Sequence, residues 1–236
     1  MKGTVQSLQS LGAVDGPGVR FVIFLQGCPL RCVYCHNPET WPLGGGTEMD
    51  TDELVRKVLR YRPYFGKDGG VTVSGGEPML QPEFVAELFR KLQEKGIHTA
   101  LDTSGIVGGE KAEQVLRHTD LALVDLKFTN AEDYRKYCKG DYHAVKEFLD
   151  LTERMKVPLW IRHVVIPGIN DNPEDIEALQ KQTEAYQNLQ KLEWLPFHNM
   201  CKEKYDELGI AFPLENTPAM SKEKLSALTE RQLLSP

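Results

Sequence analysis

Residues 70–105 read GVTVSGGEPMLQPEFVAELFRKLQEKGIHTALDTSG, and this stretch decides the fold. The runs at 70–74 and 97–102 are apolar and contain β-branched residues, which is typical of strands. The segment between them opens with Pro82 and closes before Gly96, the residue types expected at the start and the end of a helix. A strand, a helix and a second strand in this order predict a βαβ unit with parallel strands.

The same alternation continues along the chain in both directions. Further strands are predicted at 20–26, 121–126, 158–166 and 190–196, and helices at 51–62, 82–95, 109–118, 143–156, 173–188 and 221–232. Six strands are fewer than the eight of a closed (β/α) barrel, for which ~250 residues are typical. We therefore expect an α/β fold with an open, partial (β/α)6 barrel of the TIM type. A flat doubly wound sheet is the alternative.

The length and composition indicate one soluble domain over residues 1–236, with the barrel over roughly 20–198 and a C-terminal helical extension over roughly 199–236. The net charge of -6 argues against nucleic-acid binding, which relies on a basic surface. No segment approaches the ~20 apolar residues that span a bilayer, and the N-terminus lacks the apolar run of a signal peptide. We expect a cytoplasmic monomer without a membrane or nucleic-acid partner.

Three of the five cysteines lie close together in the loop 27–38, which reads GCPLRCVYCHNP. Tetrahedral zinc and a fully ligated iron–sulfur cluster both normally take four protein ligands. The only nearby fourth ligand, His36, is adjacent to Cys35 and badly placed to share a metal ion with it. Three thiolates, from Cys28, Cys32 and Cys35, can instead hold three irons of a [4Fe–4S] cluster and leave the fourth iron for a small molecule. The spacing favours this three-ligand cluster.

The remaining cysteines, Cys138 and Cys201, stand alone in the sequence, far from the loop and from each other. An odd number of cysteines without a secretory signal disfavours a disulfide framework. We expect both to be ordinary free thiols, since isolated cysteines are usually inert small residues.

The other unusual residues all follow predicted strands. They occur in the segments 74–78 (SGGEP), 102–105 (DTSG), 125–127 (DLK), 167–170 (PGIN) and 196–198 (PFH). In α/β folds, sites are built at the C-terminal ends of the strands. This convergence predicts one site that includes the cysteine loop.

Several of these residues have two interpretations. The pair Gly75 and Gly76 forms either a plain turn or a loop whose backbone approaches a ligand closely. Arg162, on a strand with apolar neighbours, forms a structural ion pair with a barrel carboxylate or contacts a ligand. His198 is by itself a hydrogen-bonding residue more often than a metal ligand, and Asp15 lies in a Gly/Pro loop as a turn former or a substrate contact.

The C-x3-C-x2-C motif, with the aromatic Tyr34 before its last cysteine, is the signature of the radical S-adenosylmethionine (SAM) enzymes. Further matching motifs cover nearly the whole chain: GVTVSGGEP (70–78), LDTSG (101–105), DLK (125–127), RHVVIPGIND (162–171) and LPFH (195–198). This ordered set resembles the glycyl-radical activases, of the type that acts on pyruvate formate-lyase. The segment 199–216 matches that family only loosely and is a candidate for partner choice.

The resemblance implies a function and a chemistry. The [4Fe–4S] cluster would reductively cleave SAM to methionine and a 5′-deoxyadenosyl radical. That radical would abstract a Cα hydrogen from a glycine on a loop of pyruvate formate-lyase (formate C-acetyltransferase) under anaerobic conditions. A flavodoxin or a ferredoxin would supply the electron.

The resemblance also assigns residues to these ligands. Contacts to SAM are implied for Tyr34, Cys35, His36, Gly75, Gly76, Glu77, Asp125, Leu126, Lys127, Arg162 and His198. A monovalent cation, Na⁺ or K⁺, is implied near Asp102, Thr103, Leu123 and Asp125. Asp15 is implied to meet the substrate peptide.

Two other classes of protein are the alternatives to this prediction. A non-catalytic iron–sulfur electron carrier would normally have a fourth cysteine and no need of a barrel. Many other glycyl-radical activases carry a cysteine-rich insert after the first motif, whereas residues 36–73 contain no cysteine here. An insert-free activase for another partner remains the second alternative.

Overall fold

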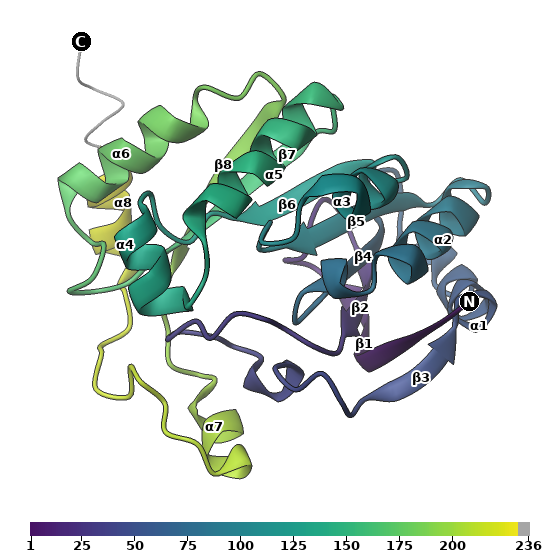
Figure 1. Ribbon diagram of the computed structural model, residues 1–236, viewed down its shortest axis with the longest axis horizontal. Coiled ribbons are helices and arrows are strands. Elements are labelled where there is room, and N and C mark those ends of the chain that lie inside the picture. Colours follow the sequence, from purple (N-terminus) through teal and green to yellow (C-terminus); the bar gives the residue numbers. More distant parts are fainter. Residues whose placement is uncertain (231–236) are drawn as a thin grey trace.

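Eight strands form one sheet in the order β3-β1-β2-β4-β5-β6-β7-β8 in the computed structural model, which describes residues 1–230 (Figure 1). The strands are β1 (Lys2–Gly12), β2 (Arg20–Leu25), β3 (Thr47–Asp50), β4 (Gly70–Gly75), β5 (His98–Thr103), β6 (Leu121–Asp125), β7 (Leu159–Val165) and β8 (Leu189–Pro196). From β2 to β8 across the sheet all neighbours pair in parallel, which confirms the six predicted parallel strands. Within the described residues β8 pairs only with β7 and β3 only with β1, so the barrel is open.

Strands β1 and β3 were not predicted from the sequence. β1 pairs antiparallel with β2 on one side and with β3 on the other. Its register against β2 shifts between Val5 and Ser7 and again between Gln9 and Gly12, so its apolar residues do not alternate regularly. β3 has four residues, which is too short for a periodic pattern.

Six helices correspond to the predicted ones: α1 (Thr51–Leu59), α2 (Pro82–Gln93), α3 (Gly109–Leu116), α5 (Tyr142–Arg154), α6 (Pro173–Thr183) and α8 (Lys222–Glu230). The last two residues of the predicted helix 221–232 lie outside the described residues. Side chains cap three of these six helix starts: Asp50 accepts a hydrogen bond from the backbone N–H of Asp52, Asp141 from that of His143, and Asn172 from that of Asp175. Shorter elements were not predicted, namely η1 (Pro38–Thr40), η2 (Arg62–Tyr64), η3 (Pro78–Leu80), α4 (Ala131–Asp133), the π-helix η4 (Tyr134–Cys138) and α7 (Lys202–Leu208).

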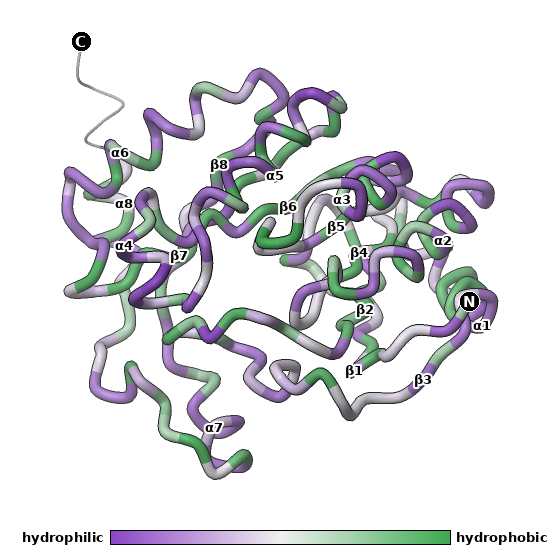
Figure 2. The backbone as a smooth tube through the Cα atoms, in the orientation of Figure 1, coloured by the Kyte–Doolittle hydropathy of each residue, from purple (hydrophilic) through white to green (hydrophobic). Residues whose placement is uncertain are grey.

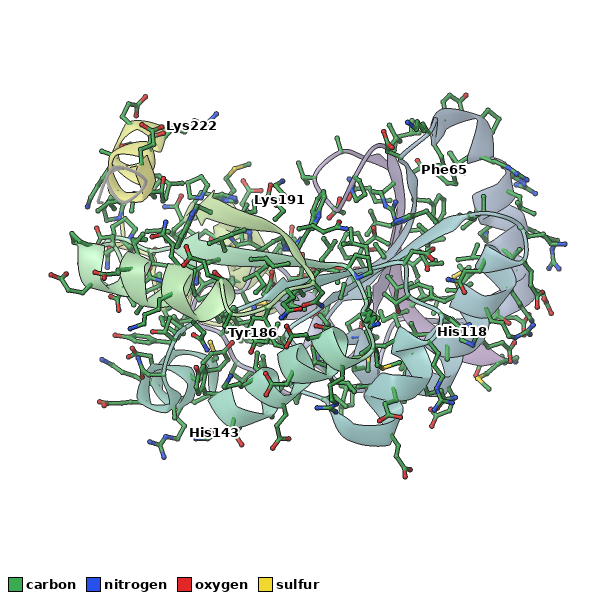
Figure 3. All side chains as sticks on the ribbon, turned by 90° about the horizontal axis from the view of Figure 1, so that it is seen from above. Phe65, His118, His143, Tyr186, Lys191 and Lys222 are labelled. Atoms are coloured by element: carbon green, nitrogen blue, oxygen red, sulfur yellow. The ribbon has the colours of Figure 1, made fainter. Side chains whose placement is uncertain are left out.

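The helices α2, α3, α5 and α6 lie on one side of the sheet (Figures 1 and 3). Along α2 and α6 hydrophobic and hydrophilic residues alternate, as expected for helices with one buried face (Figure 2). On β6, Ala122 and Val124 belong to the main core, whereas Leu121 and Leu123 belong to a smaller cluster. Because side chains alternate along a strand, Asp125 lies on the face of Leu121 and Leu123, inside the barrel.

Candidate active site

A cavity of about 480 Å³ opens at the C-terminal ends of the parallel strands. Its lining includes most of the residues that the sequence predicted for the site: Asp15, Cys28, Cys32, Tyr34, Cys35, His36, Gly75, Gly76, Asp102, Thr103, Asp125, Lys127, Arg162 and His198. Three other predicted residues, Glu77, Leu123 and Leu126, are fully buried and lie outside this lining. The exposed His143, at the start of α5, points away from the sheet (Figure 3).

The glycine loop after β4 packs directly on the cysteine loop. A Cβ on Gly76 would lie 2.1 Å from the carbonyl oxygen of Gly27 and 3.1 Å from Cβ of Cys28, so no larger residue fits there. The backbone N–H of Glu77 donates to the same Gly27 oxygen at 2.8 Å. Gly75 has a φ of 115°, which favours glycine. The close approach therefore joins two backbone segments at the cavity wall.

The buried carboxylate of Glu77 holds the loops after β4 and β5 together. One oxygen accepts hydrogen bonds from the Thr103 hydroxyl at 2.6 Å and from the backbone N–H of Met79 at 3.1 Å. The other accepts from the backbone N–H and the hydroxyl of Ser104, at 2.9 and 2.5 Å. Because four protein groups donate to it, the Glu77 carboxylate holds the cavity wall in place, whereas Gly75 and Gly76 line the cavity itself.

A group of charged side chains lies on the inner face of β5, β6 and β7. Nη2 of Arg162 lies 2.5 Å from Oδ1 of Asp102 and 2.8 Å from Oδ1 of Asp125. Nζ of Lys127 lies 3.2 Å from Oδ2 of Asp125. The structure thus contains the ion pair between Arg162 and barrel carboxylates that was one of the two expectations from the sequence.

The two carboxyl groups of this cluster differ in their affinity for protons. Burial raises the pKa of Asp102 to about 6, although Arg162 and a hydrogen bond from Ser74 oppose this effect. Burial acts in the same direction on Asp125, but Arg162 and Lys127 together outweigh it and lower the pKa of Asp125 to about 2. Asp102 is therefore the first of the two to take up a proton.

The three thiols of the cysteine loop line the cavity and are largely buried. Burial raises the pKa of Cys28 to about 12 and that of Cys35 to about 11. The neighbouring Cys138 and, to a smaller extent, burial raise the pKa of Cys32 well above its usual range. Because the thiolate is the metal ligand, binding of iron here must release protons.

The donor set fits an iron–sulfur cluster with a polar co-ligand. Three soft sulfur donors suit iron, and the cavity beside them has room for a small molecule. Within residues 1–230, Oδ2 of Asp15 and Nδ1 of His198 are buried without a hydrogen-bond partner, and both residues line this cavity. Within the same range, no three His, Cys, Asp or Glu side chains already stand in the arrangement of metal ligands.

Aromatic rings form two further parts of the lining. The rings of His36 and His198 stack with centroids 4.3 Å apart, and Nε2 of His36 lies 3.3 Å from the carbonyl oxygen of His198. Burial lowers the pKa of His36, which favours a neutral ring. On the other side, Nζ of Lys127 lies 5.7 Å from the centroid of the Tyr34 ring, within the range of a cation–π interaction.

One residue beside this site was missed by reasoning from the sequence. Cys138 is fully buried and its carbonyl oxygen accepts a hydrogen bond from the backbone N–H of Arg31 at 2.8 Å, although its neighbours in the sequence, RKYCKGD, are polar. No local signal could have found it, because the contact joins two segments far apart in the chain.

Residues 22–180 match the family model of the Radical SAM superfamily, so the chain is a radical SAM protein. It is 44% identical over 227 residues to the pyruvate formate-lyase-activating enzyme of Clostridium pasteurianum, covering 96% of this chain and 95% of that protein. It is also 44% identical over 236 residues to the protein of the same name from Staphylococcus aureus (strain USA300), covering 96% and 94%. The chain therefore belongs to the family of the pyruvate formate-lyase-activating enzymes.

Solved structures agree with the fold. A radical SAM methyltransferase from Sphaerobacter thermophilus superposes with a TM-score of 0.66 at 14% identity, covering 97% of this chain and 75% of that one. A domain of a pyruvate-formate lyase-activating enzyme from Bacteroides vulgatus superposes with a TM-score of 0.57 at 23% identity, covering 71% and 96%. Within residues 1–230 no helix has the length and apolar content needed to cross a membrane.

Proposed function

We propose that this chain generates the glycyl radical of pyruvate formate-lyase, with a [4Fe–4S] cluster held by Cys28, Cys32 and Cys35 and with SAM as cosubstrate. The observation that supports this most is that the three thiols, the glycine loop and the charged cluster line one cavity. When bound, the cluster supplies the electron that cleaves SAM into methionine and a 5′-deoxyadenosyl radical. A glycine is a suitable target, because it has no Cβ to obstruct a planar radical at Cα.

The methionine part of SAM would lie between the glycine loop and Lys127. The backbone of Gly75 and Gly76 provides polar groups without side chains in the way. Burial by itself lowers the pKa of Lys127, but Asp125, Cys32 and Tyr34 together outweigh it and raise the pKa well above its usual range, so the ammonium group stays charged. A buried, permanently charged ammonium group suits the carboxylate of SAM.

The rest of the cavity would position the adenosyl group and the substrate peptide. His198, with its unpartnered Nδ1, is proposed to contact the adenosyl group, and Asp15, with its unpartnered Oδ2, the peptide around the target glycine. A Na⁺ or K⁺ ion near Asp102, Thr103, Leu123 and Asp125 stays a prediction, because both carboxylates there already pair with Arg162. The electron donor, a flavodoxin or a ferredoxin, and a cytoplasmic location belong to the same proposal.

The decisive experiment is anaerobic. The reconstituted protein, a reductant and SAM are incubated with pyruvate formate-lyase, and an EPR spectrum is recorded. We expect a glycyl-radical doublet and stoichiometric 5′-deoxyadenosine. The matched control, Cys32→Ala, should lose the cluster and both products while its circular dichroism spectrum stays native.

Two outcomes would contradict different parts of the proposal. SAM left intact beside a reduced cluster would exclude the radical reaction. SAM cleavage without the doublet would exclude pyruvate formate-lyase as the partner and favour another glycyl-radical enzyme.

A further inference from the structure

The loop 13–19 (AVDGPGV) joins β1 to β2 and carries Asp15 into the cavity. Both ends of the loop lie at the start of β2, because Gly12 pairs with Arg20. Asp15 nevertheless lines the cavity toward the opposite ends of the strands, so the loop folds back along the inside of the barrel. Within the described residues, a single hydrogen bond reaches the backbone of residues 13–18: the hydroxyl of Thr72, on β4, donates to the carbonyl oxygen of Asp15 at 2.7 Å.

The direction of this hydrogen bond is fixed by Arg20. Nε of Arg20 lies 3.0 Å from Oγ1 of Thr72, and both side chains are completely buried. A guanidinium group can only donate, and a hydroxyl group has one proton. Because the Thr72 hydroxyl accepts from Arg20, its own proton is directed to the carbonyl oxygen of Asp15.

Arg20 is itself held by the two neighbouring strands. Its Nη2 donates to the carbonyl oxygen of Val71 on β4, and its Nη1 lies 3.2 Å from Nδ1 of His98 on β5. Burial, together with the charge of Arg20, lowers the pKa of His98, so the ring is neutral and its Nδ1 accepts. The guanidinium group therefore has one orientation, and this orientation fixes that of the Thr72 hydroxyl.

The carboxylate of Asp15 has one oxygen without a protein donor. Within residues 1–230, Oδ2 is buried and has no hydrogen-bond partner. It packs on Gly12, where an added Cβ would lie 2.8 Å from it. Gly12 under the carboxylate and the hydrogen bond at the carbonyl oxygen together fix the direction of this side chain. A buried carboxylate oxygen in this position can accept a hydrogen bond from a ligand in the cavity.

We propose that Arg20 and Thr72 are positioning residues for the substrate peptide: they hold the backbone of Asp15 so that its carboxylate accepts a hydrogen bond from a backbone N–H of that peptide. This inference rests on the proposed function, in which Asp15 meets the peptide. Without the Thr72 hydroxyl, residues 13–18 have no hydrogen bond to the barrel, so the peptide loses a preorganised acceptor. SAM keeps its site, because its proposed contacts lie on other loops.

The test compares Thr72→Val with Thr72→Ser in the reconstituted full-length protein. Valine keeps the shape of threonine without the hydroxyl, whereas serine keeps the hydroxyl and loses the methyl group, so the comparison separates the hydrogen bond from packing. Glycyl-radical formation is followed by EPR, and 5′-deoxyadenosine by chromatography, at increasing concentrations of pyruvate formate-lyase. The affinity for SAM is measured without the partner. Thr99→Val is the matched control, because Thr99 is also fully buried on a strand but its hydroxyl donates to the carbonyl oxygen of His118.

We expect Thr72→Val to raise KM for pyruvate formate-lyase about tenfold, the size typical of one lost hydrogen bond. More 5′-deoxyadenosine should form per glycyl radical than in the native protein, while the affinity for SAM stays native. Thr72→Ser and Thr99→Val should both remain near the native KM. In an Asp15→Ala background, Thr72→Val should raise KM no further, because it acts through Asp15.

A native KM in Thr72→Val would overturn the inference. Equal rises in Thr72→Val and Thr72→Ser, or a further rise in the Asp15→Ala background, would assign Thr72 a packing role. If Thr72→Val does not fold, Arg20→Met replaces it, since it removes the donor to the Thr72 hydroxyl, and a native KM there overturns the inference. A native protein that forms no glycyl radical would instead overturn the proposed function, and this inference with it.

Discussion

Two buried arginines on the inner face of the barrel, Arg20 at the start of β2 and Arg162 in β7, have opposite surroundings. Arg162 binds two carboxylates at the cavity end. Arg20, at the other end of the barrel, binds neutral groups: its guanidinium donates to the Thr72 hydroxyl at 3.0 Å and to the carbonyl oxygen of Val71, and it lies 3.2 Å from Nδ1 of His98. Both are buried, but only one is paired with opposite charge.

The pKa values of the two arginines reflect this difference. Burial lowers the pKa of Arg20 to about 10, against a weaker opposing effect of Asp120 and Asp15. Burial also lowers the pKa of Arg162, but Asp102 and Asp125 outweigh it, so the net shift is upward. At the Arg20 end of the barrel the charge is thus held mainly by hydrogen bonds to neutral groups, whereas the cavity end concentrates charges of both signs where a polar ligand would bind.

The largest effect is expected from Arg162→Met, which leaves the Asp102 carboxylate without a cation and Asp125 with Lys127 as its remaining partner. Breaking such a pair by removing one partner typically costs about 3–5 kcal/mol. Urea unfolding of the protein at pH 7 should show a loss of this size. The triple variant Arg162→Met/Asp102→Asn/Asp125→Asn should recover most of it, and an equally unstable triple variant would mean that packing of the arginine, rather than charge, stabilises this end.

A second prediction concerns His163, which fixes the end of β6 from the helix side. Its Nδ1 lies 2.7 Å from the carbonyl oxygen of Leu126, and its Nε2 lies 2.9 Å from Nδ2 of Asn170. The ring therefore donates at Nδ1, accepts at Nε2 and is neutral. Burial lowers the pKa of His163 to about 4.

The sign of the pH effect follows from this shift. The unfolded chain binds a proton at His163 near pH 6.5, whereas the folded chain binds it only near pH 4. Stability is therefore complete above pH 6.5 and falls by about 3 kcal/mol as the pH drops to 4. His163→Gln should flatten the pH dependence of urea unfolding in this window, while the exposed control His143→Gln should leave it unchanged. Equal slopes for all three proteins would contradict the assignment.

The six parallel strands of the fold could be predicted because each is an apolar run bounded by Gly, Pro or Asp. The antiparallel edge could not. β1 is largely exposed, and its bulges interrupt the alternation that a half-buried strand normally shows. An edge strand of this kind is defined by pairing with β2, which is a property of the fold rather than of the segment.

Because sites in α/β folds lie at the C-terminal ends of the parallel strands, most of the residues that line the cavity could be predicted from the sequence. It could not reveal what each side chain bonds to. Glu77 was expected to contact SAM, yet its carboxylate is occupied by Thr103, Ser104 and Met79. The backbone hydrogen bond from Arg31 to Cys138 likewise depends on tertiary structure, which brings η4 against the cysteine loop.

The smallest of the three effects is expected at the other end of the barrel, from Arg20→Met. This change removes a charge that has no carboxylate in hydrogen-bond contact, so no opposite charge is left unpaired. It does leave the Val71 carbonyl and the Thr72 hydroxyl without their donor, and an unsatisfied buried acceptor costs about 1–3 kcal/mol. Urea unfolding at pH 7 should therefore show a loss below that of Arg162→Met. Adding Thr72→Val to Arg20→Met should lower the free energy of unfolding by less than Thr72→Val does alone, because the two residues form one hydrogen-bonded unit. If Arg20→Met costs as much as Arg162→Met, then burial of the long side chain, and not the pairing of charge, determines what each end of the barrel contributes to stability.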